Sequence, residues 1–188
     1  MDLRAESVDD REAVLDVHRR AFGDHGATVA ALVGALRADD PAALSVVAAD
    51  GGRVVGHVLF TRSLLDAPRR LVDVQVLSPL AVLPDRQRRG VGAALVRHGL
   101  ELLEARGVPL VFLEGDPGYY GRLGFTAAAG CGFRKPSLRI PDAAFQVVRL
   151  SAYRPWMTGT FVYSAPFWVH DCVGLREPAD DGLGGLDG

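Results

Sequence analysis

The sequence predicts one domain of the mixed α/β class, built on a single central sheet. Segments with helical periodicity and segments with strand periodicity follow one another along the chain, in the order strand, two helices, three strands, helix, strand, short helix, two strands. The 188 residues, of which 48% are hydrophobic, suffice for one domain with its own core. We expect this domain to span residues 1–176 and the Gly- and Asp-rich residues 177–188 to form a disordered tail.

The first half of the chain is expected to contain strands and two helices. These are a strand over 3–6, helices over 10–21 and 26–37, and strands over 44–49, 53–61 and 71–83. The turn Gly51–Gly52 predicts a hairpin, since glycine tolerates a positive φ. Val72, Val74 and Val76 alternate with polar residues, which indicates a strand with one buried face. Pro79 lacks an amide donor and predicts a bulge in that strand.

A long helix and a short apolar strand dominate the second half. The elements expected there are a helix over 90–106, a strand over 110–113, a short helix over 117–123, and strands over 145–150 and 160–163. Val91, Leu95 and Leu103 fall on one face of the long helix. The strand that follows is wholly apolar, which is typical of a strand buried on both faces. Asp116 followed by Pro117 predicts an N-cap and the first residue of the short helix.

The overall charge and the cysteine content exclude several classes of protein. A net charge of −2 gives no electrostatic basis for binding nucleic acid or an anionic membrane. The N-terminus lacks the apolar region of a signal peptide, and no window approaches the roughly 18 apolar residues of a membrane helix. Cys131 and Cys172 are too few for a disulfide framework and lack metal-ligand spacing. We therefore expect a cytoplasmic protein without a metal.

The segment between the strand that ends near Leu83 and the long helix predicts a phosphate or pyrophosphate site. The first turn of a helix has backbone N–H groups without partners and carries a partial positive charge. Small residues let an anion approach that backbone, and arginines add charge: Gly90, Gly92 and Ala93, with Arg86, Arg88 and Arg89. The phosphate loop with Gly-Lys-Ser/Thr and the dinucleotide motif with a third glycine are both absent. Taken alone, the segment is equally consistent with a glycine-rich helix start beside solvated arginines.

Two motifs in this region resemble the GNAT family of N-acetyltransferases. The segment Gln87–Gly92 matches that family's Gln/Arg-x-x-Gly-x-Gly/Ala signature, and Tyr120–Phe125 resembles its Tyr-x-x-x-Gly-Phe landmark. The resemblance to the family covers about residues 44–127. Within the family, residues 116–120 and Ala144–Phe145 are similar to the YhbS-like branch. It implies a central, mostly antiparallel twisted sheet of about six or seven strands flanked by about four helices.

The resemblance implies acetyl-CoA as the cosubstrate. It places Leu80, Ala81 and Val82 beside the pantetheine arm and the backbone of Arg88–Ala93 at the pyrophosphate. With Gln87 of the signature, the residues predicted to bind the cosubstrate are Leu80, Ala81, Val82, Gln87, Arg88, Arg89, Gly90, Val91, Gly92 and Ala93. Many members carry an Asn several residues before the family tyrosine, whereas this chain has none over 113–116. No role is transferred to those positions on the strength of the family pattern.

Catalytic roles follow less directly from the residues. Tyr120 matches the family tyrosine near the CoA sulfur and is therefore the candidate general acid. The alternative role for Tyr120 is that of a packing residue whose hydroxyl is hydrogen-bonded. Glu114 follows the buried strand and is a candidate general base, although many relatives release the proton through water. His57 and His98 are candidates for satisfied structural groups, because a lone histidine in a strand or on an apolar helix face is usually one.

The sequence leaves the function open between two classes. The first is an acetyl-CoA-dependent N-acetyltransferase that acts on a small molecule or a protein amino group, as a monomer or a homodimer. The second is a non-catalytic acyl-CoA-binding sensor or regulatory module, which needs the phosphate site but not Tyr120. The acceptor is an unidentified amine, whose pocket we place within residues 130–167. Four residues are candidates to line this pocket: Phe133, Arg134, Trp156 and Phe167. For each of them, a place in an exposed loop or at a sheet edge is the alternative.

Overall fold

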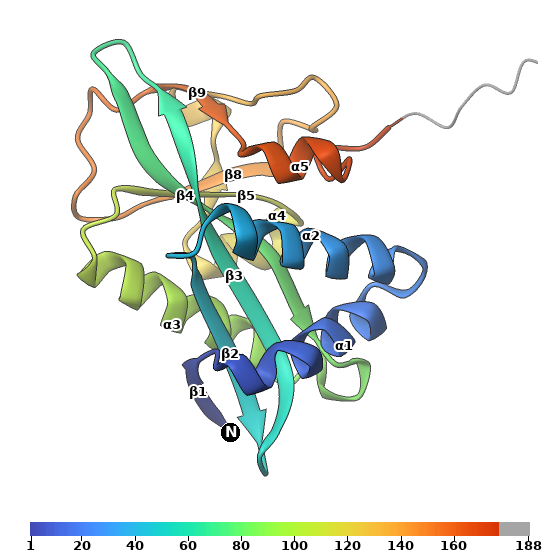
Figure 1. Cartoon of the computed structure of the whole chain (residues 1–188). Helices are drawn as coiled ribbons and strands as arrows, with labels where there is room; N and C mark the ends of the chain where they lie inside the picture. The colour runs from blue at the N-terminus through green and yellow to red at the C-terminus, as the bar shows by residue number, and fades with distance from the viewer. Residues whose placement is uncertain (177–188) are drawn as a thin grey trace, which may run out of the picture.

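One nine-stranded sheet organises residues 1–176, which are the residues that the computed structural model describes (Figure 1). Its strands are β1 (Asp2–Ala5), β2 (Leu44–Asp50), β3 (Arg53–Asp66), β4 (Leu71–Val82), β5 (Leu110–Glu114), β6 (Thr126–Ala127), β7 (Phe133–Arg134), β8 (Phe145–Arg149) and β9 (Gly159–Val162). The main path runs β1-β2-β3-β4-β5-β8-β6, and β9 joins β3 to β7. Only the β4–β5 and β7–β9 pairs are parallel among the described strands.

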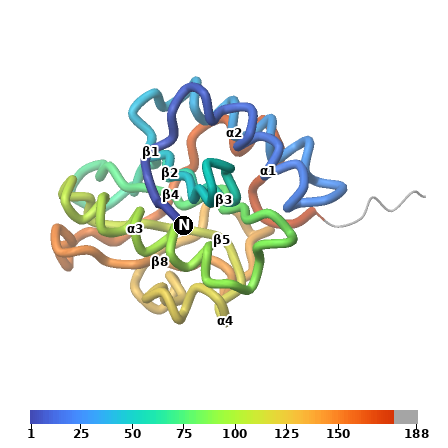
Figure 2. Tube along the Cα trace, turned by 90° about the horizontal axis from the view of Figure 1, so that it is seen from below, coloured from blue at the N-terminus to red at the C-terminus, as the bar shows by residue number. Residues whose placement is uncertain are grey.

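Helices cover both faces of this sheet. They are α1 (Arg11–Ala21), α2 (Gly26–Asp39), α3 (Val91–Ala105), α4 (Pro117–Tyr120) and α5 (Ala165–Val169). Figure 2 shows α1 and α2 on one side of the strands and α3 and α4 on the other. On β3, Gly56 lies against Val91 and Leu95 of α3, whereas the next residue, His57, reaches His18 of α1. Successive side chains of a strand point to opposite faces, so α1 and α3 cover opposite faces of β3.

The predicted fold class is confirmed, and the differences lie at the ends of elements and in three short elements that were not predicted. β3 continues to Asp66 instead of ending near 61. The strands β6 and β7 have two residues each, and α5 has five. None of these three was predicted, because such short segments carry no measurable periodicity. The expected tail at 177–188 lies outside the described residues, and no helix within 1–176 has the length and apolar character needed to cross a bilayer.

β4 shows the predicted alternation and the predicted bulge. Val72, Val74 and Val76 are buried, while Asp73 between them is exposed. Val58 of β3 pairs with Leu80 whereas Phe60 pairs with Leu77, so that Ser78 and Pro79 together oppose a single residue. The register shift therefore falls at the proline, where a ladder donor is missing.

A chain of buried polar side chains crosses the α1 face of the sheet. His18 Nε2 lies 2.8 Å from His57 Nδ1, and His57 Nε2 lies 2.8 Å from Ser45 Oγ. Ser45 Oγ donates to Glu6, which also accepts from Arg37. Burial, with the nearby Arg37 charge, lowers the pKa of His18 to about 3. Burial, with the charges of His18 and Arg37, holds the pKa of His57 well below 6.5.

These two histidines predict a loss of stability in mild acid. Both are neutral in the fold, but the unfolded chain takes up protons as the pH falls below 6.5, the ordinary histidine pKa. The free energy of unfolding should therefore fall from pH 6.5 toward the His18 pKa of about 3. The slope contributed by each imidazole is at most about 1.4 kcal/mol per pH unit.

Urea denaturation at a series of pH values measures this effect. The variant His18→Leu should show a shallower slope between about pH 6.5 and 5 than the parent, because one titrating imidazole is gone. Above about pH 7.5, both proteins should show equal slopes, which serves as the internal control. An unchanged slope in the variant would assign the acid sensitivity to other groups.

Candidate functional site

Strands β4 and β5 pair over only a short stretch and then separate. Gln75 of β4 pairs with Val111 of β5, and Val76 pairs with Phe112. Beyond Val76, β4 continues to Val82 while paired with β3 on its other edge. The edge of β4 that faces β5 therefore offers backbone groups that no strand of the described chain pairs.

The N-terminus of α3 begins beside the end of β4. Gly90 caps the helix in the left-handed region, with φ of +83°. The first main-chain bond of the helix runs from the Ala94 N–H to the Gly90 carbonyl over 2.9 Å. Within residues 1–176, the N–H groups of Val91, Gly92 and Ala93 thus have no main-chain acceptor. Together with the helix dipole, these donors favour an anion.

A cavity of about 250 Å³ lies in front of this helix end. Its lining residues are Leu80, Val82, Arg86, Gln87, Arg88, Gly90, Val91, Gly92, Ala93 and Tyr119. The cavity thus brings together every residue predicted around the cosubstrate except Ala81 and Arg89. Ala81 is only 3% exposed and pairs with His57, so its side chain faces α1. Arg89 is exposed and lies outside the lining.

Two side chains brace the turn that leads into α3. The Gln87 side chain donates from Nε2 to the Val82 carbonyl over 3.0 Å, which ties the turn to the end of β4. Arg86 Nη1 lies 2.6 Å from Asp50 Oδ2 at the β2–β3 turn. Arg88 adopts a positive φ of 58°, an unusual conformation for a residue with a side chain. These contacts tie the turn to the end of β4 and to the β2–β3 turn.

The two tyrosines of α4 occupy different places. Tyr119 lines the cavity, and its Oη lies 2.6 Å from the position that a Cβ on Gly92 would take. The Tyr120 ring lies 5.8 Å from the Phe125 ring and fills the space that a Cβ on Gly115 would need. Burial raises the pKa of Tyr120, which keeps its phenol protonated. Gly115 stands in the region where an Asn is absent, and the close approach of Tyr120 explains why a glycine stands there.

Glu114 lies at the end of β5 and is held by the C-terminal segment. Its Oε1 accepts from Tyr163 Oη over 2.7 Å, and its Oε2 accepts from the Gly174 N–H over 3.0 Å. Burial raises the pKa of Glu114, although both hydrogen bonds and the Arg139 charge oppose this rise. Asp116 accepts from the Gly118 N–H over 2.9 Å and caps α4 as predicted. His57 belongs to the buried polar chain and lies far from solvent.

The residues predicted to line the acceptor pocket do not form one site. Phe167 is buried in the core, and Trp156 lies beneath the guanidinium groups of Arg69 and Arg70, each 5.5 Å from its ring. Phe133 and Arg134 line a cavity of about 300 Å³ on the β7 side. A different cavity, with Asp39 and Ser63 in its walls, was not predicted, because its residues come from three distant segments of the chain.

Comparison with known proteins shows that the chain is similar to acetyltransferases. The family model described as an acetyltransferase (GNAT) domain matches residues 2–128. The chain is 37% identical over 155 residues to the uncharacterized N-acetyltransferase YjhQ of Escherichia coli, covering 80% of this chain and 84% of that protein. It is also 37% identical over 154 residues to the uncharacterized N-acetyltransferase YhbS of E. coli K12, covering 79% and 87%.

Solved structures agree with this fold, and two of them contain CoA or acetyl-CoA. The crystal structure of E. coli YhbS in complex with CoA superimposes with a TM-score of 0.79 at 32% identity, covering 88% of this chain and 91% of that chain. A GNAT family acetyltransferase of Brucella melitensis in complex with acetyl-CoA gives a TM-score of 0.70 at 31% identity, covering 88% and 97%.

Proposed function

The chain belongs to the GNAT family of acetyltransferases, and from this we propose that it moves an acetyl group from acetyl-CoA to a primary amine. The observation that supports the proposal most directly is the cavity at the start of α3. There, unpartnered N–H groups, small residues and arginines surround one space beside the separating strands. Two similar structures contain CoA or acetyl-CoA, which is the ligand expected for such a space.

The proposed binding mode assigns each part of the cavity to a part of the cosubstrate. The backbone from Arg88 to Ala93 holds the pyrophosphate, because its N–H groups and the helix dipole favour negative charge. Leu80 and Val82 lie beside the pantetheine arm, and Ala81 contributes only its backbone, since its side chain is buried on the α1 face. Gln87 acts indirectly by fixing the turn.

The proposed chemistry uses two side chains of this protein. Acetyl-CoA supplies the activated acyl group when it is bound. The Tyr120 phenol, kept protonated by its burial, gives its proton to the departing sulfur. A backbone N–H on the unpaired edge of β4 near Val82 stabilises the negative charge that develops on the carbonyl oxygen. Glu114, whose pKa is raised by burial, is the candidate to accept the proton of the amine.

A thiol-release assay tests the proposal. Purified protein with acetyl-CoA should release free thiol when it is given one class of amine among amino acids, polyamines, aminoglycosides and peptides. For that class we expect thiol release at least about tenfold faster than the uncatalysed reaction. Orientation of the reactants and a single proton donor are each known to accelerate reactions by more than this factor. Protein heated to unfolding is the control. Binding of acetyl-CoA without thiol release from any amine class would contradict catalysis and favour the sensor.

A further inference from the structure

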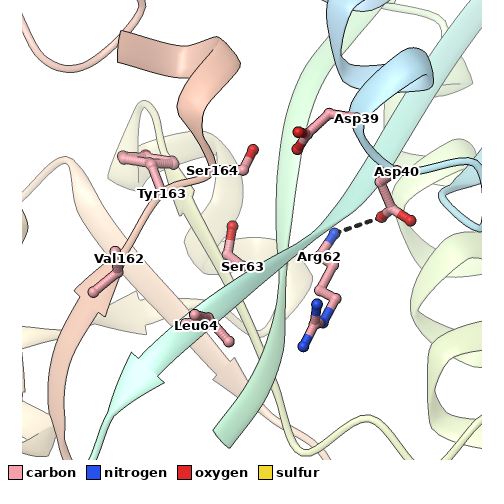
Figure 3. Close-up of a pocket in the computed structure, with 8 residues that line it drawn as sticks. All are labelled: Asp39, Asp40, Arg62, Ser63, Leu64, Val162, Tyr163 and Ser164. Atoms are coloured by element: carbon pink, nitrogen blue, oxygen red, sulfur yellow. Dashed lines mark hydrogen bonds between the residues drawn. The ribbon is translucent and has the colours of Figure 1, made fainter. Parts of the chain in front are cut away.

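A second cavity, of about 210 Å³, lies where α2 ends beside β3 and β9 (Figure 3). Its lining residues come from the end of α2, from β3, and from β9 with the start of α5: Asp39, Asp40, Arg62, Ser63, Leu64, Val162, Tyr163 and Ser164. It shares no lining residue with the cavity at the start of α3. Ser63 lies on the same face of β3 as His57, so this cavity opens on the α1 and α2 side.

Two hydroxyl groups in this cavity have no hydrogen-bond partner among residues 1–176. Ser63 is only 3% exposed, and within residues 1–176 its Oγ makes no hydrogen bond. The Oγ of Ser164 is likewise buried and unpartnered in the described chain. Figure 3 shows both hydroxyls and the Asp39 carboxylate turned toward the same space. Buried polar groups are normally satisfied, so these two indicate a polar ligand.

The charge in this cavity is negative. Asp40 already accepts from the Arg62 N–H over 2.8 Å and from the Ala42 N–H over 3.2 Å. The Arg62 guanidinium is engaged by Asp73, with Nε 2.7 Å from Oδ1. Asp39 is exposed and lines the cavity, so its carboxylate is accessible to a cationic ligand.

One side-chain pair connects this cavity to the proposed reaction centre. Tyr163 lines the cavity and donates from Oη to Glu114 Oε1 over 2.7 Å. Glu114 ends β5, beyond the point at which β4 and β5 separate. A ligand in the cavity therefore lies on the face of the sheet opposite α3, with the Tyr163 side chain between it and the candidate base.

We propose that this cavity binds the acetyl acceptor, and that the acceptor is a small-molecule amine with a second cationic group. This inference rests on the proposed function. The amine that attacks must be neutral, so the charge that Asp39 balances belongs to another ammonium of the same molecule. Ser63 and Ser164 accept hydrogen bonds from that ammonium, whose three N–H groups point in different directions, so that the two hydroxyls can receive those not directed at Asp39. Diamines and polyamines have this chemistry.

Calorimetry without acetyl-CoA tests the inference separately from catalysis. The probes are 1,3-diaminopropane and 1,3-propanediol, which have the same length and differ in that only the diamine carries ammonium groups. We expect the diamine to bind at least about tenfold more tightly than the diol, as one charge-assisted contact predicts. Asp39→Asn should remove that difference, and Ser63→Ala should weaken diamine binding severalfold. Asp24→Asn, at an exposed aspartate outside the cavity, is the matched control and should bind like the parent.

The outcomes separate this inference from the proposed function. Equal binding of the two probes, or an Asp39→Asn variant that keeps the preference, overturns the diamine site even if thiol release occurs with other amines. A preference for the diamine that is lost in Asp39→Asn but kept in Asp24→Asn supports the site, even if no thiol is released. In that second case the proposed acetyl transfer fails and the diamine site stands.

Discussion

Gly92→Glu is expected to abolish acetyl-CoA binding, with a dissociation constant raised at least about 100-fold, or about 2.7 kcal/mol. A Cβ at this position would lie 2.6 Å from Tyr119 Oη and 3.6 Å from Val82 Cγ2, inside the cavity at the start of α3. The glutamate carboxylate would also place negative charge where the helix dipole and the free N–H groups favour the pyrophosphate. The steric clash and the added negative charge both weaken acetyl-CoA binding.

Isothermal titration calorimetry with acetyl-CoA measures this effect, and Gly34→Glu is its matched control. Gly34 lies in α2, is exposed, and has no neighbouring atom within 4 Å of the position that a Cβ would take. The same substitution there should change the affinity by less than about twofold, since exposed surface changes cost little. Thermal unfolding of both variants shows whether each remains folded. Equal affinity of Gly92→Glu and the parent would remove the pyrophosphate assignment.

Tyr120→Phe is expected to lower the turnover number about 100-fold or more while leaving acetyl-CoA affinity within about twofold, in line with the loss of a general acid. Only the hydroxyl is lost, so the ring keeps its contacts with Phe125 and with the space beside Gly115. Because burial raises the pKa of Tyr120, the phenol remains a proton donor through the neutral range. The loss should therefore appear in turnover and not in binding.

The neighbouring tyrosine provides the control for this prediction. Tyr119→Phe removes a hydroxyl from the adjacent residue of the same helix, at the cavity wall. We expect its turnover to fall by less than about threefold, because no proton is assigned to it. Steady-state thiol release and calorimetry on both variants separate turnover from binding. Unchanged turnover in Tyr120→Phe would mean that another group supplies the proton.

Much of the fold could be predicted because its signals are local. The alternation along β4, the bulge at Pro79 and the cap at Asp116 each depend on neighbours within a few residues. The segment from Gln87 to Ala93 was predictable for the same reason, since a helix start, small residues and arginines occur consecutively. The predicted GNAT resemblance is confirmed by the family match over residues 2–128.

Predictions that needed contacts between distant segments were less successful. The lining proposed for the acceptor pocket included Phe167, which is buried in the core, and Trp156, which packs under two arginines. The cavity with Asp39 and Ser63 was not anticipated, because its walls come from α2, β3 and β9. Hydrophobic and aromatic side chains look alike in sequence whether they pack inside the fold or line a pocket.

By itself, the sequence determined the class of fold, the order of its longer elements and the start of the long helix near Gly90, because periodicity and capping act between near neighbours. Only the tertiary structure decided which side chains of that segment face the cavity. Ala81 turns away since strand alternation places it beside His57. It also decided that Glu114 is held by Tyr163 and Gly174, residues about 50 and 60 positions away, because such contacts exist only after distant segments pack together.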